Sequence, residues 1–335
     1  MLKNKTILIT GATGSFGRAL TNHLLKNNKE IKKIIIFSRD ELKQFQMQNE
    51  IDKKLLPKLR FFLGDIRDRD RLELAFEKVD IVVHAAALKQ VPAAEYNPFE
   101  FIKTNILGTQ NIVEAALKKN VKNVIALSTD KAVAPVNLYG ATKLCLEKLI
   151  ISANNISGDK DIKFSVVRYG NVFGSRGSVY PYFKKMKYKK YFPITDKKMT
   201  RFNMSLSDSV KLVTWSLQNN IGGEIFIPKL PSYKITDLAK AIDPFKKLEI
   251  VGIRPGEKIH ETLISESEIA NIYDLRKYFA IFNNPPLKII RKIKKNKIKK
   301  VKIDQYSSGT NSKFLTDAEL KKIISNFEKY NDTLQ

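Results

Sequence analysis

The sequence has few of the residues from which disulfides and metal sites are built. It contains one cysteine, Cys145, and three histidines, at positions 23, 84 and 260. A single thiol cannot form a disulfide within the chain, and the histidines lack the spacing of metal ligands. We therefore expect neither a disulfide nor a metal site, and we interpret Cys145 as a small packing residue.

Long apolar runs are also missing. No segment is apolar over the length that a bilayer-spanning helix requires, and the first four residues lead straight into an expected strand, without a signal peptide. With 335 residues, 43% of them hydrophobic, the chain can bury a large core. We expect a cytoplasmic protein of two domains with no membrane partner.

Acidic residues are scarce beside basic ones: 34 Asp and Glu oppose 60 Lys and Arg, for a formal net charge of +26. Only twelve of the basic residues are arginine, and the lysines are spread along the chain, whereas nucleic-acid-binding patches are localised and rich in arginine. The densest cluster, 288–302, alternates lysine with isoleucine, which is also typical of an edge strand or connector. We predict no specific nucleic-acid partner.

What the first half does contain is a regular alternation of strand and helix patterns. Such alternation predicts an α/β fold with a doubly wound parallel sheet, whose ligands bind at the carboxyl ends of the strands. Strands are expected at Lys5–Thr10, Lys33–Phe37, Arg60–Leu63, Asp80–His84, Asn123–Leu127 and Phe164–Arg168, and helices at Phe16–Lys26, Glu41–Lys53, Arg69–Glu77, Pro98–Lys119 and Tyr139–Asn154.

After Arg168 the segments become irregular and richer in Gly, Ser and Pro. We predict a helix at Ser207–Leu217, capped by Ser207, and a strand at Glu224–Ile227 that returns to the sheet. We assign 1–172 and 203–228 to a Rossmann domain, and 173–202 and 229–335 to a smaller, interleaved substrate-binding domain with a C-terminal lid.

A glycine-rich turn follows the first strand, with the spacing Gly-x-x-Gly-x-x-Gly. Gly11 permits a tight turn, Gly14 lets the backbone approach a pyrophosphate, and Gly17 allows close helix packing. A plain structural turn explains the glycines too, but their place between a strand and a helix favours a dinucleotide site. The cofactor contacts expected here are Gly11, Thr13, Gly14, Ser15, Phe16 and Gly17.

The end of the second strand indicates which dinucleotide is bound. Arg39 beside Ser38 suits the 2′-phosphate of NADP, whereas an acid would favour NAD through the ribose 2′-hydroxyl. Asp40 keeps NAD open, and it is also explained as the N-cap of the next helix. We predict NADP, with further contacts from segments that follow other strands: Asp65, Ile66, Ala85, Ala86 and Lys89.

Tyr139 and Lys143 are four residues apart and share a face of an expected helix. A neighbouring ammonium lowers the pKa of a phenol from its ordinary value of about 10, and this suits Tyr139 to take a proton from an alcohol. Just before the pair, Thr129, Asp130 and Lys131 supply further polar groups. The alternative for Asp130 and Lys131 is a surface ion pair at a strand end, which their place between the last core strand and the catalytic helix disfavours, and the alternative for Thr129 is a strand-end cap.

Arg201 and Arg254 are candidates for a diphosphate clamp, because a guanidinium fork matches pairs of phosphate oxygens. Each can also be an ordinary surface arginine. Lys89 either reaches a substrate phosphate or sugar, or is a solvated loop lysine.

Several motifs together resemble the nucleotide-sugar-modifying branch of the extended short-chain dehydrogenase/reductase family. They are the glycine turn, Tyr139-x-x-x-Lys143, Tyr169-Gly170-Asn171-Val172 and Arg254-Pro255-Gly256-Glu257. Within that branch, the segments 85–92, 128–132 and 199–202 resemble UDP-N-acetylglucosamine 4,6-dehydratases, and 38–43 and 137–143 look most like their C5-inverting members, which open pseudaminic acid synthesis. The resemblance implies an NADP-dependent hydro-lyase, a UDP-sugar substrate and a homo-oligomer, from dimer to hexamer.

The resemblance also implies an order of use. Tyr139 removes the C4 hydroxyl proton while hydride passes to NADP, and Lys143 holds the ribose. Lys131 then takes the C5 proton and Asp130 protonates the departing C6 hydroxyl, while Thr129 orients the C4 oxygen. Substrate contacts are implied for Lys89, Asn171, Thr200, Arg201, Arg254 and Glu257.

Three alternatives stay open at this stage. The first is a C5-retaining dehydratase, whose membrane-anchored relatives carry long N-terminal spans that this sequence lacks. The second is a UDP-sugar 4-epimerase, which would not need Lys131, and the third is a non-catalytic NADP-sensing or nucleic-acid-binding protein, which would lack Tyr139, Lys143 or Asp130.

Overall fold

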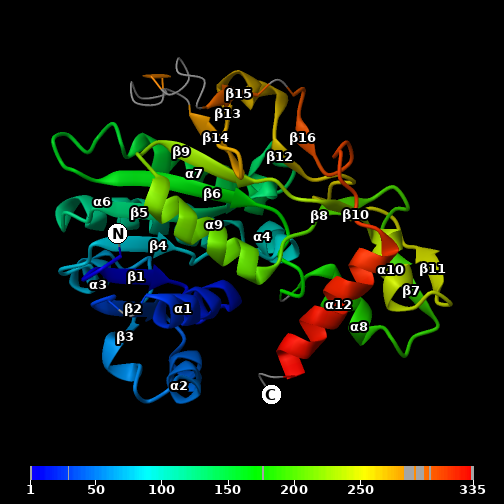
Figure 1. The fold of residues 1–335 in the computed structure, drawn as a ribbon, viewed down its shortest axis with the longest axis horizontal. Helices are drawn as coiled ribbons and strands as arrows, with labels where there is room; N and C mark the ends of the chain where they lie inside the picture. The colour runs from blue at the N-terminus through cyan, green and yellow to red at the C-terminus, as the bar shows by residue number, and fades with distance from the viewer. Residues whose placement is uncertain are drawn as a thin grey trace.

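The computed structural model describes residues 2–28, 30–175, 177–282, 290–291, 298–301 and 303–332. Within these residues, ten strands form one large, mostly parallel sheet with helices on both faces (Figure 1), which confirms the predicted doubly wound fold. In their order across the sheet the strands are β15 (Lys299–Lys300), β13 (Ile272–Asp274), β14 (Tyr278–Phe282), β9 (Glu224–Pro228), β6 (Lys163–Tyr169), β5 (Asn123–Thr129), β4 (Ile81–His84), β1 (Thr6–Thr10), β2 (Lys33–Ser38) and β3 (Leu59–Leu63).

From β3 to β6 the sheet has the strand order of a dinucleotide-binding fold, and every neighbouring pair is parallel. β1 and β4 are buried along their whole length, because helices cover both faces, and this is why their sequences are continuous apolar runs. β9 lies parallel beside β6, so the chain returns to the sheet as predicted from Glu224–Ile227.

The helices beside the sheet lie in two layers. α1 and α9 contact each other on one face, and α6 contacts α3 and α7 on the other. The helices and helical turns of this part are α1 (Ser15–Asn27), α2 (Glu41–Glu50), η1 (Leu56–Lys58), α3 (Arg69–Ala75), α4 (Val91–Tyr96), α5 (Pro98–Phe101), η2 (Ile102–Leu107), α6 (Gly108–Lys118), η3 (Asp130–Ala132), α7 (Leu138–Ser152), α9 (Leu206–Asn219) and η4 (Glu266–Asn271).

Three sequence predictions are wrong in detail. The single helix expected at Pro98–Lys119 is divided by a π-helical segment, η2, which the apolar periodicity does not reveal. The cap of α9 is Ser205, whose hydroxyl accepts from the Asp208 amide at 3.0 Å, and not Ser207. Cys145 is exposed on α7, so it does not serve as a packing residue.

The sheet also takes in residues that the sequence analysis assigned to the second domain. β14 pairs antiparallel with β9, and β13 pairs antiparallel with β14. The apolar run of β14 indicates a strand, but strand patterns do not specify a partner, and the alternation rule anticipates only parallel neighbours. Most of the basic segment 288–302 lies outside the described residues; Lys299 and Lys300 form β15 at the edge of the sheet.

A smaller lobe carries its own apolar core, in which Phe183, Phe192, Leu238 and Leu320 are fully buried. The C-terminal helix α12 packs against α10 and covers this core (Figure 1). The elements outside the large sheet are α8 (Val179–Lys185), β7 (Tyr191–Ile194), β8 (Thr200–Phe202), β10 (Ser232–Lys234), α10 (Ile235–Ile242), β11 (Lys247–Ile250), β12 (Thr262–Ile264), β16 (Tyr306–Ser307) and α12 (Asp317–Asp332).

A buried ion triad fixes helix α7 against the sheet. The guanidinium of Arg168, on β6, donates to Glu147 of α7 at 2.6 and 2.9 Å and to Glu268 of η4 at 2.8 and 3.0 Å. Arg168 is 1% exposed, so both carboxylates are needed to compensate its buried charge. The triad holds the helix that carries Tyr139 and Lys143.

Candidate active site

A cavity of about 670 Å³ opens at the carboxyl ends of the parallel strands. Every residue predicted to contact the cofactor lies in its wall, together with Thr129, Lys131 and Asn171 from the other predicted sets. The cofactor set in the wall is Gly11, Thr13, Gly14, Ser15, Phe16, Gly17, Ser38, Arg39, Asp65, Ile66, Ala85, Ala86, Lys89, Tyr139 and Lys143. Segments that are distant in sequence therefore meet in one site, as parallel-sheet topology requires.

Backbone geometry explains two glycines of the first turn. Gly11 has φ of +64°, and a Cβ there would lie 2.8 Å from the Ala86 Cα. A Cβ at Gly17 would lie 2.4 Å from the Ala12 Cα. Side chains at these two positions would push the turn away from the neighbouring strand end and from α1, so glycine is required for this cradle.

The end of β2 places cations beside small hydroxyls. The hydroxyls of Thr13 and Ser38 are 2.8 Å apart, and the half-exposed Arg39 has its Nη1 3.7 Å from Asp65. Asp40 caps α2 by accepting from the Lys43 amide at 3.0 Å, so its alternative role as an N-cap is confirmed. Lys43, whose ammonium pairs with Asp40, is a further cation in the cavity wall that the sequence analysis did not single out.

Tyr139 and Lys143 both lie in the wall on α7, but their electrostatics differ from the sequence prediction. Burial raises the pKa of Tyr139 to about 12, and the charge of Lys131 opposes the rise. Burial also lowers the pKa of Lys143 to about 8, against the field of Glu147. The Lys143 ammonium donates to the Leu127 carbonyl at 2.6 Å. The chain therefore raises the pKa of this phenol instead of lowering it, because desolvation outweighs the opposing charge of Lys131.

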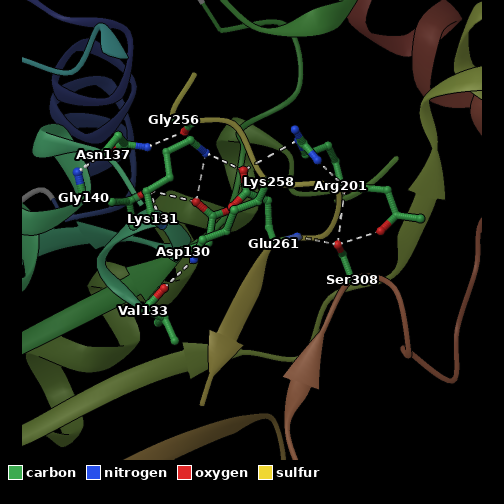
Figure 2. A network of polar contacts seen from close by, with 12 residues as sticks. Asp130, Lys131, Val133, Asn137, Gly140, Arg201, Gly256, Lys258, Glu261 and Ser308 are labelled. Carbon is green, nitrogen blue, oxygen red and sulfur yellow. Dashed lines mark hydrogen bonds and ion pairs between the residues drawn. The ribbon is translucent and has the colours of Figure 1, made fainter. Parts of the chain in front are cut away.

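Lys131 lies between two buried carboxylates (Figure 2). Its Nζ is 3.2 Å from Asp130 Oδ1 and 2.9 Å from Oε1 of Glu261, a residue 130 positions away in sequence. Burial opposes the charge on Lys131, but Asp130 and Glu261 outweigh it and raise the pKa of this ammonium. Burial and the charge of Glu261 raise the pKa of Asp130. The cluster thus holds an ammonium at the cavity and a carboxyl that readily keeps its proton.

Asp130 itself is buried behind the wall. Its Oδ1 accepts from the Thr129 hydroxyl at 2.9 Å, while its Oδ2 has no hydrogen-bond partner among the described residues. That oxygen lies against Gly170, a wall residue, where a Cβ would be 3.1 Å away. An unpartnered buried oxygen next to the cavity suits a group that donates to or accepts from a ligand.

Four predicted substrate contacts do not line the cavity. Thr200 is 2% exposed and bonds to His260 and Ser308, each at 2.8 Å. The Arg201 guanidinium is buried and donates to the carbonyls of Thr200 and Ile259 at 2.7 and 3.1 Å. Arg254 is exposed, 4.0 Å from Glu257. The sequence motifs identify these residues, but they do not specify where the lobe places them.

The loop 254–261, between β11 and β12, is hydrogen-bonded to the segment that carries Asp130 and Lys131 (Figure 2). Lys258 Nζ donates to the Val133 carbonyl and Asn137 Nδ2 to the Gly256 carbonyl, each at 2.7 Å. Asn137 also caps α7 by accepting from the Gly140 amide at 2.8 Å. No role was predicted for Glu261 or Lys258 from the sequence. Asn137 could have been predicted as a helix cap, because an asparagine directly before an apolar helix is a common N-cap.

The described residues contain no group of three or more His, Cys, Asp or Glu side chains that could hold a metal ion. Nor does any described helix have the length and hydropathy needed to cross a bilayer.

The fold and the cavity define a class, the Rossmann-fold proteins that bind a dinucleotide at the carboxyl ends of parallel strands. A family model described as Polysaccharide biosynthesis protein matches residues 7–283. The chain belongs to this family of extended short-chain dehydrogenases/reductases.

Relatives match the chain from end to end. A Campylobacter jejuni protein named UDP-N-acetylglucosamine 4,6-dehydratase (inverting) is 51% identical, over 98% of this chain and 100% of its own length. A Rickettsia bellii protein named UDP-glucose 4-epimerase is 42% identical, over 100% and 99%. The X-ray structure of Pen from Bacillus thuringiensis superposes with a TM-score of 0.88 at 37% identity, covering 98% of this chain and 99% of that one.

Proposed function

We propose that the chain is a C5-inverting UDP-N-acetylglucosamine 4,6-dehydratase, a hydro-lyase that uses NADP. The observation that carries the proposal is the placement of Lys131 in the cavity wall, 3.2 Å from Asp130 and in one site with Tyr139. Oxidation of an alcohol needs only Tyr139 and Lys143, so the second acid–base pair indicates a second reaction. The 51% identical relative from Campylobacter jejuni supports the same substrate and product.

The residues in the wall fit a nicotinamide dinucleotide. The glycine turn leaves room for its pyrophosphate, Asp65 and Ile66 line the adenosine side, and Tyr139 and Lys143 lie at the nicotinamide side. Bound NADP would accept the C4 hydride and return it to C6. Tyr139 takes the C4 hydroxyl proton, Thr129 orients the C4 oxygen, and Lys143 holds the ribose.

The elimination uses the second pair. The ketone at C4 acidifies the C5 hydrogen. The Lys131 ammonium first passes a proton to Asp130 across their 3.2 Å contact, and the resulting neutral amine takes the C5 proton while the C6–O bond breaks. Asp130 gives its proton to the departing hydroxyl, which leaves as water. The new negative charge on Asp130 then stabilises the new ammonium of Lys131, 3.2 Å away. The hydride would return from the cofactor to C6, and a proton from water would add to the opposite face of C5, so that redox is balanced and C5 is inverted.

The predicted substrate contacts, from both parts of the chain, are also proposed. Lys89 and Asn171 line the cavity and are assigned to the sugar nucleotide. The motif residues Thr200, Arg201, Arg254 and Glu257, which do not line the cavity, are assigned to its diphosphate side on the family motifs that carry them. We also assign the product to pseudaminic acid synthesis and expect the chain to self-associate.

NADP is proposed over NAD because Ser38, Arg39 and Lys43 lie in the cavity wall at and just after the end of β2, where a dinucleotide-binding fold receives the adenosine ribose. Replacing Arg39 with alanine removes one charge-assisted contact to the 2′-phosphate and should raise the Kd for NADP about 10- to 100-fold, with little effect on NAD. Isothermal titration with each cofactor measures this. Arg60→Ala, an exposed arginine on β3, is the matched control. Equal weakening toward both cofactors would show that Arg39 does not select the phosphate.

The function is tested by incubating the purified protein with UDP-N-acetylglucosamine in deuterated water, without added reductant, and following proton NMR. We expect a C6 methyl signal, a deuterium at C5 and the inverted configuration at that carbon. A spectrum without a methyl signal overturns the dehydratase proposal, and a retained C5 configuration overturns inversion alone.

A 4-epimerase is the second candidate, because the 42% identical Rickettsia relative carries that name. An epimerase would use Tyr139 and Lys143 but leave Lys131 and Asp130 without a chemical task. The same spectra separate the two, since an epimerase changes C4 and forms no methyl group.

A further inference from the structure

Glu261 is a buried carboxylate that reaches the catalytic segment from the other lobe. It is 2% exposed, and its Oε1 is 2.9 Å from Lys131 Nζ and 3.7 Å from Arg201 Nε. Its backbone is held on both sides by Ser308: the Glu261 amide donates to the Ser308 hydroxyl at 2.9 Å, and the Ser308 amide donates to the Glu261 carbonyl at 2.8 Å. The backbone that carries this carboxylate is therefore held by contacts that do not involve Lys131 (Figure 2).

The loop that carries Glu261 is itself fastened to the catalytic segment. The contacts Lys258 to Val133 and Asn137 to Gly256 flank the bond from Lys131 to Glu261. The first turn of α7 also lies close to the backbone of Lys131: a Cβ at Gly140 would be only 2.2 Å from the Lys131 carbonyl oxygen. The backbone of Lys131 is thus set by α7, and its ammonium is set by Glu261.

A lysine side chain has four flexible carbons and needs such a partner to hold its nitrogen at one place. Asp130 alone is a neighbour in sequence and gives only one contact, at 3.2 Å. Glu261 supplies a second contact from an independent element, and its Oε2 has no hydrogen-bond partner among the described residues.

We infer that Glu261 is a positioning residue for the elimination: it holds Lys131 Nζ between Asp130 and the cavity, and it sets the pH range in which Lys131 can take the C5 proton. The inference rests on the proposed function, in which Lys131 is the base. It assigns Glu261 no contact with the sugar and no role in oxidation at C4.

The direction of the pH effect follows from the charges around Lys131. The groups that face it are Asp130, Tyr139, Arg201, Tyr233, Lys258 and Glu261. Burial and Arg201 favour the neutral amine, whereas Asp130 and Glu261 favour the ammonium. Replacing Glu261 with glutamine removes one of the two anions and must lower the pKa of Lys131. The elimination needs the Asp130–Lys131 pair to hold one proton. Glu261 also raises the pKa of Asp130, so its loss lets the pair give up its second proton at a lower pH, and the acid limb of the elimination rate moves down with it.

The test compares Glu261→Gln with wild type in two half-reactions. Reduction of bound cofactor, seen as the absorbance of reduced nicotinamide on adding UDP-N-acetylglucosamine, should change less than about twofold. Formation of the C6 methyl product should fall about 10- to 100-fold at its optimum, and its acid limb should move down by about one pH unit or more. A uniform loss at every pH, or an equal loss in both half-reactions, overturns the inference.

Two further variants serve as controls for the charge of Glu261 and for the loss of any acidic side chain. Glu261→Asp keeps the charge and should restore the acid limb to its wild-type position, even if its rate stays lower. Glu266→Gln removes an exposed acid nearby and should leave both half-reactions unchanged. Thermal melting of each variant identifies loss of fold, and a folded Glu261→Asp with the shifted limb of Glu261→Gln would also overturn the inference.

A readout without turnover separates this inference from the proposed function. Acetic anhydride labels the neutral amine of Lys131, and peptide mass spectrometry gives the labelling rate at each pH. Labelling should begin at lower pH in Glu261→Gln than in wild type. If wild type forms no keto-sugar but this shift is present, the proposed function fails and the positioning of Lys131 by Glu261 stands; if the shift is missing, the positioning fails on its own.

Discussion

Replacing Lys131 with alanine is expected to stop water elimination while oxidation at C4 continues. The C5 proton then loses its assigned base, and loss of general-base catalysis should slow product formation about 10²- to 10⁴-fold. Tyr139 and Lys143 are still present, so reduced cofactor should accumulate on the enzyme, although more slowly, because the charge of Lys131 no longer opposes the raised pKa of Tyr139. Stopped-flow absorbance measures the first step, and proton NMR of the methyl group measures the second.

The control for this variant is Lys148→Ala, which removes an exposed lysine from α7 and should behave as wild type. Loss of Lys131 also leaves Asp130 and Glu261 without their shared cation, so thermal melting is recorded for both variants. Normal product formation by Lys131→Ala would refute the assigned role of this residue.

Replacing Tyr139 with phenylalanine should slow both half-reactions together. The C4 hydroxyl proton loses its assigned acceptor, so oxidation should slow about 10²- to 10⁴-fold, and reduced cofactor and product should both form at that reduced rate. In wild type the chain raises the pKa of Tyr139 to about 12, which leaves the phenol mostly protonated at neutral pH. The rate of cofactor reduction should therefore rise as the pH is raised through the alkaline range, and this dependence should vanish in Tyr139→Phe.

Tyr188→Phe, an exposed tyrosine of the second lobe, is the matched control. Titration with NADP checks that Tyr139→Phe still binds cofactor. Cofactor reduction at the wild-type rate in Tyr139→Phe would mean that another group accepts the C4 proton.

Much of the fold could be predicted because parallel strands buried on both faces leave a simple signal. The apolar runs of β1, β2 and β4, separated by helices, indicate the doubly wound sheet and therefore the side on which its ligands lie. The antiparallel strands β13 and β14 could not be assigned to this sheet, because a short apolar run does not specify the strand with which it pairs. The π-helical break in η2 likewise leaves the apolar period undisturbed.

The candidate site was predictable where its residues follow strands or share one helix. Thr129, Lys131, Tyr139 and Lys143 lie within one short segment, and topology brings that segment to the glycine turn. Glu261 could not be predicted, because its contact with Lys131 depends on how the second lobe folds over a distance of 130 residues. The pKa of Tyr139 was predicted in the wrong direction, since spacing shows a nearby cation but does not measure burial.

The most direct test of the account is the fate of a deuterium placed on C4 of UDP-N-acetylglucosamine. In the proposed reaction the C4 hydride passes to the bound cofactor and returns to C6 within one turnover. Proton and deuterium NMR of the product should therefore find the label in the C6 methyl group. A label that stays at C4, or that leaves the enzyme on free reduced cofactor, would contradict the account.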